Sequence, residues 1–336
     1  MQLEMNLRET IKSLILKFEF SVAEKTIDEA IAKTTASTPE WFDLEILRAY
    51  IEFVKHSLFS REEAFSQLTI AFGKLEDLAQ RMKAANYEDG LNWAQYYSGL
   101  CKYTQAEAKN DDFSLFKQTD EIWHDVEQKI IEGTDFLLIA ELLLSKALLY
   151  EQYAKRGEMP AHHDPNVTVE FAIENMLDKV QEQFFKLLLK IGSKEDSELK
   201  MRLNYALARV KGLRDEKLGK MQEDLTKSGR IKVDALGSIS YYFLTATKYA
   251  KDLEAAYFLC AIPLQLCKII SRYIYDSLQF DPPPDLNLRL GIFTQQIRDC
   301  LDTCKKYNIA FIAEQAVDLL STVRDELLKN NIKIQI

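Results

Sequence analysis

Apolar side chains recur every three or four positions along almost the whole chain, which is the spacing of one buried face on a helix. Leu7, Ile11 and Leu14 share one such face, and Leu44 and Leu47 belong to another. The eleven glycines and seven prolines fall mostly between these stretches, where they end and turn helices. Almost nothing in the pattern favours a β-strand. The sequence therefore predicts an all-α protein.

The periodic stretches are expected to pair as antiparallel helices joined by short polar turns. About thirteen helices in pairs of roughly 40 to 50 residues predict an α-solenoid array. Because each pair contacts mainly its neighbours, such an array can form a single repeat domain over residues 1–336. The predicted pairs are 6–18 with 21–34, a helix from Pro39 with one after Ser60, 91–108 with 113–131, 135–156 with 166–191, 233–250 with 252–277, and 285–306 with 309–329.

Local signals mark several helix ends. Thr38 precedes Pro39 as an expected N-cap, and Ser60 with Glu63 has the spacing of a capping box. The long stretch 195–227 contains Gly212 and Gly219, each of which costs about 1 kcal/mol against alanine inside a helix. We therefore expect a break or a kink near either glycine. Pro263 is likewise expected to kink the helix 252–277.

Two proline-containing joints interrupt the helical pattern. The segment 157–165 has two prolines in nine residues, so we expect a protruding loop there that is a candidate contact loop. A sub-division of the chain is predicted near 157–166. The segment 281–285, with three consecutive prolines, is expected to form a rigid spacer.

Small residues followed three positions later by tyrosine occur on the first helix of two predicted pairs. Ala147 precedes Tyr150, and Ala246 precedes Tyr249, with Tyr242 seven positions before Tyr249. In these positions the chain resembles the tetratricopeptide-like (TPR-like) helical-repeat superfamily. The order of Gly99 and Leu100 is reversed relative to that family's pattern, and no unit has its closing proline. The resemblance implies the architecture only, and no peptide-clamping residue is carried over.

Composition and charge narrow the function classes. A net charge of −9 argues against general nucleic-acid binding, whose affinity comes mainly from neutralising phosphates. The apolar stretch 136–150 contains two charged residues and is shorter than the roughly 20 residues of a spanning helix, so no membrane span is predicted. The five cysteines lie in apolar stretches, and the first residues lack the apolar core of a signal peptide. We expect a cytoplasmic protein, with the nucleus as the other candidate compartment.

The candidate metal-ligating residues are better interpreted as structural. Glu121 and His124 form one Glu-x-x-His motif where a di-iron bundle needs two, and His162 and His163 lie in a loop. The cysteines are spaced for core packing and not for a zinc cage. No phosphate loop or nucleophile motif occurs, so no cofactor is predicted and catalysis has no positive support.

A basic segment offers a binding function instead. Between Arg202 and Lys232 nine basic residues stand against four acidic ones. In a continuous helix Arg202, Arg209, Lys220 and Lys227 fall within about 20° of one another and form a basic stripe. The stripe is suited to an acidic, helical or phosphorylated segment of another protein. The alternative interpretation is an ordinary solvated face.

Some of the clustered tyrosines are expected to be exposed on a groove wall, and core filling is the alternative for any one of them. Tyr241, Tyr242 and Tyr249 cannot all point inward, because neighbours on a helix lie about 100° apart. Exposed tyrosine supplies large contact area at little entropic cost. The sequence therefore favours a non-catalytic scaffold or adaptor with a concave helical surface. The alternative is a helical-bundle enzyme or small-molecule-binding protein with an enclosed apolar cavity.

Overall fold

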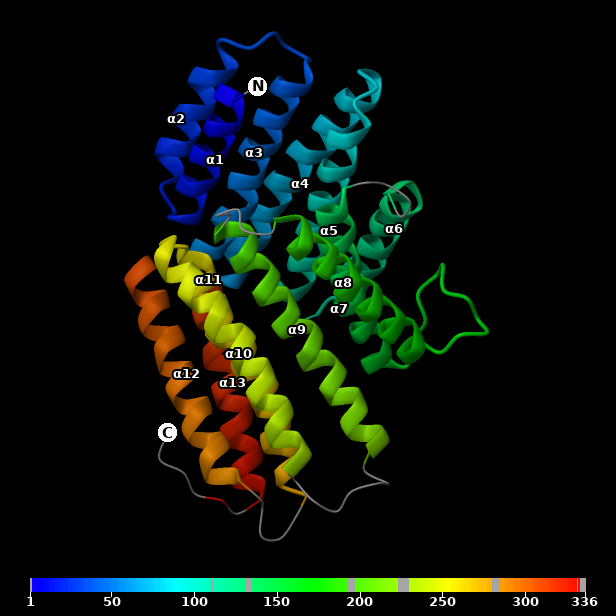
Figure 1. Ribbon diagram of the computed structural model, residues 1–336, viewed down its shortest axis with the longest axis vertical. Coiled ribbons are helices and arrows are strands. Elements are labelled where there is room, and N and C mark those ends of the chain that lie inside the picture. The colour runs from blue at the N-terminus through cyan, green and yellow to red at the C-terminus, as the bar shows by residue number, and fades with distance from the viewer. Residues whose placement is uncertain are drawn as a thin grey trace. The chain divides into compact units, whose positions relative to one another are not determined.

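The computed structural model describes residues 2–109, 111–130, 135–191, 197–222, 230–279, 285–330 and 332. Within these ranges it contains thirteen α-helices, one short 3-10 helix and no strand, and within each of its two units helices adjacent in sequence pack against each other (Figure 1). The prediction of an all-α protein of paired helices is confirmed. The chain divides into two compact units, Met1–Lys194 and Glu195–Ile336.

The first unit holds the first eight α-helices. Their extents follow the predicted periodic stretches closely, with differences of a few residues at the ends. They are α1 (Gln2–Leu16), α2 (Phe20–Ile31), α3 (Pro39–Lys55), the 3-10 helix η1 (His56–Leu58), α4 (Arg61–Ala84), α5 (Glu88–Ala108), α6 (Phe113–Ile130), α7 (Phe136–Arg156) and α8 (Val169–Ile191).

Side-chain caps begin α3 and α4 as predicted. The Thr38 hydroxyl accepts a hydrogen bond from the Trp41 amide at 3.3 Å, with Pro39 at the first helical position. At α4 the Ser60 hydroxyl accepts from the Glu63 amide, and the Glu63 carboxylate accepts from the Ser60 amide. These bonds satisfy amides that have no partner within the helix.

The core of the first unit is continuous along its helices. Ile11, Ile27 and Ile51 fill the space between α1, α2 and α3, where all three are fully buried. Further along, the Trp123 indole of α6 packs on α5 and donates to the Tyr96 carbonyl at 3.1 Å. Gly99 lies directly against this indole, because a Cβ atom there would be only 2.1 Å from Trp123 Nε1.

The second unit contains α9 (Ser197–Gln222), α10 (Arg230–Asp252), α11 (Ala256–Ser277), α12 (Leu286–Tyr307) and α13 (Ala310–Lys329). The most extensive packing joins α9 to α10 and α11 to α12. The helices predicted as the pair 233–250 and 252–277 correspond to α10 and α11, which do contact each other, but less extensively than α10 contacts α9. Pairing thus begins at α9, which the sequence left without a partner.

Helix α9 runs through Gly212 and Gly219 without a break, so a break is not found there, and a kink stays a prediction. A Cβ atom at Gly212 would be 2.5 Å from Ile269 Cδ1 of α11. The glycine therefore leaves room for the Ile269 side chain, whose flexible end would have to shift if a Cβ atom were present.

Helix α11 is the apolar centre of the second unit and contains Pro263 within its length. By length and composition alone, α11 is the one helix among the described residues that could cross a membrane. The core helix of a soluble protein passes the same test, and 67% of the apolar window is buried. Its burial accounts for its composition.

The loop between α7 and α8 is non-helical as predicted and extends from Gly157, whose φ of 65° ends α7 in the left-handed conformation. It is the extended green loop of Figure 1. The predicted sub-division near 157–166 falls here, inside the first unit. The predicted proline spacer lies outside the described residues, except for Asp285. A single repeat domain over 1–336 stays a prediction.

Candidate partner-binding surface

The two arginines of the predicted basic stripe contact other side chains of the second unit. Arg202 donates from Nε to Glu198 at 2.8 Å, and its guanidinium lies 5.5 Å from the centre of the Phe258 ring. The Arg209 guanidinium lies 5.5 Å from the centre of the Tyr205 ring. Lys220 belongs to α9 by its backbone, and Lys227 lies outside the described residues. Both arginines are half-buried. The two first cations of the stripe therefore contact side chains of their own unit and are not fully open to solvent.

The three predicted tyrosines differ in exposure. Tyr241 is 64% exposed, whereas Tyr242 and Tyr249 are half-buried. The Tyr241 and Tyr242 rings meet edge to face with 5.5 Å between their centres, and Lys211 Nζ of α9 lies 5.5 Å from the centre of the Tyr242 ring. The expectation that adjacent tyrosines would not all point inward is confirmed for Tyr241.

Tyr241 belongs to a solvent-facing row on α10 that the sequence reasoning missed. Leu244 is 67% exposed and lies one turn further along, followed by the exposed Lys248 and Lys251. These four side chains fall within about 80° around the helix axis. We call Tyr241, Leu244, Lys248 and Lys251 the α10 face.

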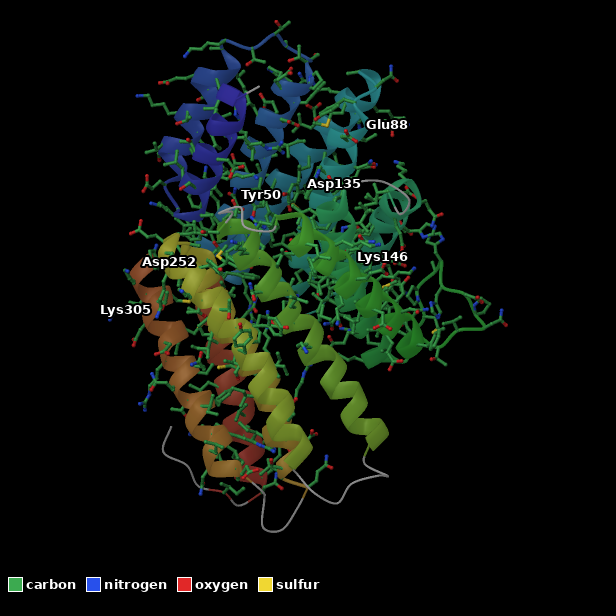
Figure 2. The ribbon with its side chains drawn as sticks, in the orientation of Figure 1. Tyr50, Glu88, Asp135, Lys146, Asp252 and Lys305 are labelled. Atoms are coloured by element: carbon green, nitrogen blue, oxygen red, sulfur yellow. The ribbon has the colours of Figure 1, made fainter. Side chains whose placement is uncertain are left out.

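The opposite side of α10 is its core side, with Ile239, Phe243, Ala246 and Ala250 all buried. Because that side supplies the packing, the α10 face is not needed for the fold of the helix. Among the described residues no ion pair of Lys248 or Lys251 is found within 4.0 Å, and Asp252 ends the helix beside them (Figure 2). The spacing of Leu244 from Tyr241 could have indicated this face from sequence.

A second polar group lies in the first unit, between α6 and α7. Lys146 is 1% exposed, and its Nζ is 2.5 Å from Glu127 Oε2 (Figure 2 labels Lys146). Asp120 is also 1% exposed, and its Oδ1 has no hydrogen-bond partner among the described residues. Burial raises the pKa of Asp120, against the lowering effect of Lys146. Sequence reasoning noted Lys146 only as a charge in a core helix.

The histidines of the rejected metal motifs come together from different segments. The rings of His124 on α6 and His162 in the loop after α7 are stacked, with 3.9 Å between centres and 9° between planes. Over the described part of the chain, no group of three or more His, Cys, Asp or Glu side chains is arranged to hold a metal ion. The two rings therefore pack against each other across two segments.

The cysteines are free and buried, as their apolar surroundings predicted. In the second unit the Cys300 thiol donates to the Cys260 carbonyl at 3.4 Å, and the Cys267 thiol donates to the Phe293 carbonyl at 3.6 Å. Burial raises the pKa of Cys101 and of Cys267, which keeps these thiols protonated at neutral pH. They serve the core as small apolar groups.

Comparison with known proteins adds no assignment. No family model matches the chain, and no curated protein matches it. The function therefore has to be argued from the surfaces described above.

Proposed function

We propose that this protein is a non-catalytic scaffold or adaptor, built as a TPR-like array, that binds an acidic helical segment of another protein on the α10 face. The observation that carries the proposal is the exposure of Tyr241 and Leu244, 64% and 67%, side by side on one helix. Buried tyrosine at an interface contributes strongly to affinity, since it brings much contact area for little lost freedom.

The charge of the α10 face favours an acidic partner. Lys248 and Lys251 follow the apolar pair on the same side of α10, and Lys211 of α9 flanks Tyr242. From Tyr241 to Lys251 the face spans about 15 Å at about 1.5 Å per residue. A partner helix of about three turns, with apolar residues over Tyr241 and Leu244 and carboxylates over the lysines, matches this length.

The arginines of the basic stripe have a lesser role in this proposal. Arg202 is engaged with Glu198 and Phe258, so recruiting it would cost those contacts. Arg209, beside Tyr205, and Lys220 extend the cationic character of α9. The five buried thiols support a reducing compartment such as the cytoplasm, with the nucleus as the other candidate.

The test uses two synthetic helices as probes, because the natural partner is unidentified. One is an 18-residue amphipathic peptide of leucine and glutamate, and the other is its lysine counterpart. We expect fluorescence anisotropy to show at least about tenfold tighter binding of the acidic peptide, and the double variant Lys248→Glu/Lys251→Glu to abolish that preference. The double variant Tyr241→Ser/Leu244→Ser should weaken the binding of both peptides.

The matched control reverses two exposed lysines elsewhere in the second unit. Lys305→Glu/Lys306→Glu on α12 makes the same change of net charge on a helix other than α10 (Lys305 is labelled in Figure 2). It should reduce acidic-peptide binding far less than the α10 variant at 150 mM salt, where long-range effects are screened. Equal losses in the two double variants, or equal binding of the two peptides, would refute the proposal.

A further inference from the structure

The loop 157–168 is fastened to the helices of the first unit by a small number of contacts. His162 stacks on His124 of α6, and Glu158 forms an ion pair with Lys117 of α6 at 3.1 Å. The His163 ring lies edge-on to the Tyr150 ring of α7, with 6.1 Å between centres. Pro160 is buried as well, whereas most other residues of the loop are exposed, so these few contacts hold it in place.

The stacked rings lie beside the charged groups between α6 and α7. His124 is influenced by Asp120 and Glu127 on its own helix, by Lys146 of α7, and by His162 of the loop. The two carboxylates favour a protonated His124. Burial, His162 and Lys146 oppose protonation, in that order, and together they lower the pKa of His124. Tyr150 and His163 complete the surroundings on the α7 and loop sides.

We propose that the loop 157–168 is an acid-released latch: the His124–His162 ring stack holds it over the α6–α7 junction at neutral pH, and protonation of the two rings releases it. Two neutral imidazoles stack favourably, whereas two imidazolium ions with 3.9 Å between their ring centres repel each other. This inference concerns the first unit and does not depend on the proposed function of the α10 face.

The direction of the effect follows from proton linkage. In the open loop His162 no longer lies against His124, so one cause that lowers the pKa of His124 in the closed loop is removed. The open form therefore binds protons more readily. The closed loop keeps its full stability above about pH 6.5 and loses it as the pH falls through the lowered pKa of His124.

Opening would uncover the side chain that the loop covers. Tyr150 is 4% exposed while His163 lies against it, and it is adjacent in space to the Lys146 ammonium, 5.6 Å from its ring centre. Acid release thus changes the surface of the first unit near α7 from a covered one to an aromatic and charged one.

Hydrogen exchange of the full-length protein tests the latch. We expect exchange of the hydrogen-bonded loop amides of Glu158, His163 and Val167, corrected for the intrinsic pH dependence, to rise by at least about tenfold from pH 7.5 to pH 5, given the repulsion of two charges at this separation. His162→Phe keeps a stacked ring that cannot be protonated and removes the repulsion between two imidazolium ions, so its acid-induced rise should be clearly smaller than that of the wild type. With only four histidines in the chain, ring resonances can be assigned and followed by NMR.

Lys117→Gln is the matched control, because it removes another fastening of the same loop without removing a histidine. It should increase exchange at both pH values and leave their ratio unchanged. His162→Phe retains every other titrating group of the wild type, so general acid effects cancel in the comparison. No rise in the wild type, or the same acid-induced rise in His162→Phe, would overturn the inference.

Discussion

Replacing Gly99 by alanine tests the packing of α5 against α6. The added Cβ would lie 2.1, 2.5 and 2.8 Å from Nε1, Cδ1 and Cε2 of the Trp123 indole. All three atoms belong to a rigid ring that is fully buried. The indole cannot rotate away freely, because it lies near the rings of Tyr96 and Tyr103 and donates to the Tyr96 carbonyl.

Three effects determine the size of the change. Overpacking a rigid core site costs about 1 to 3 kcal/mol, and weakening the indole hydrogen bond costs about 1 kcal/mol. Alanine recovers about 1 kcal/mol of helix propensity. The sum is a destabilisation of about 2 kcal/mol, which lowers the melting temperature of a unit of this size by about 6 °C.

Tryptophan fluorescence is a selective assay for this change. Trp41, Trp93 and Trp123 are all three tryptophans of the chain, and all lie in the first unit. Gly73→Ala in α4 is the matched control, since no atom lies within 4 Å of the added Cβ, and it should stabilise by about 0.5 to 1 kcal/mol. If Gly99→Ala shifted the transition in the same direction as Gly73→Ala, the close contact of Gly99 with the indole would be refuted.

Three further changes are predicted. Burial lowers the pKa of His56 to about 4, so the unfolding free energy of the first unit should lose about 3 kcal/mol as the pH falls from 6.5 to 4, and His56→Leu should lack this loss in acid titrations followed by tryptophan fluorescence. Lys146→Met leaves Glu127 without its cation and should cost about 3 kcal/mol in urea denaturation, a loss that adding Glu127→Gln partly reverses. Arg289→Met removes the bond to the Tyr273 carbonyl at the end of α11 and should cost about 2 kcal/mol, measured by circular dichroism, whereas a change below 0.5 kcal/mol would contradict that role.

Local chemistry made much of the fold predictable. Thr38 and Ser60 begin helices because each hydroxyl accepts a hydrogen bond from an amide only three residues away. Such a short-range contact can be predicted from the local sequence. The helical stretches themselves follow from the three- and four-residue spacing of apolar side chains. These features need no knowledge of distant segments.

Helix continuity at Gly212, the pairing of α9 and the stacking of two histidines depend on tertiary contacts, which the sequence does not reveal. Gly212 was expected to break or kink α9, but the helix continues through it, and the Ile269 side chain of α11 lies against it. The pairing of α9 with α10 likewise depends on which faces meet. His124 and His162 are far apart in sequence, and only the fold of the loop brings their rings together.

The candidate site was predictable in part for the same reason. The neighbouring tyrosines at 241 and 242 required that one be exposed, and Tyr241 is. The stripe on α9 was inferred from spacing alone, which does not reveal that Arg202 is paired with Glu198 and packed on Phe258. The partner, the adaptor function and the compartment stay predictions.

Site-specific photo-cross-linking tests the central proposal most directly. The photoreactive residue p-benzoylphenylalanine replaces Tyr241 on the α10 face or, as a control, Val317 on α13, which is 52% exposed in the same unit. The account predicts that the acidic helical peptide cross-links at position 241 and not at 317, and that Lys248→Glu/Lys251→Glu suppresses the adduct. Equal cross-linking at both positions, or binding of the peptide without an adduct at 241, would contradict it.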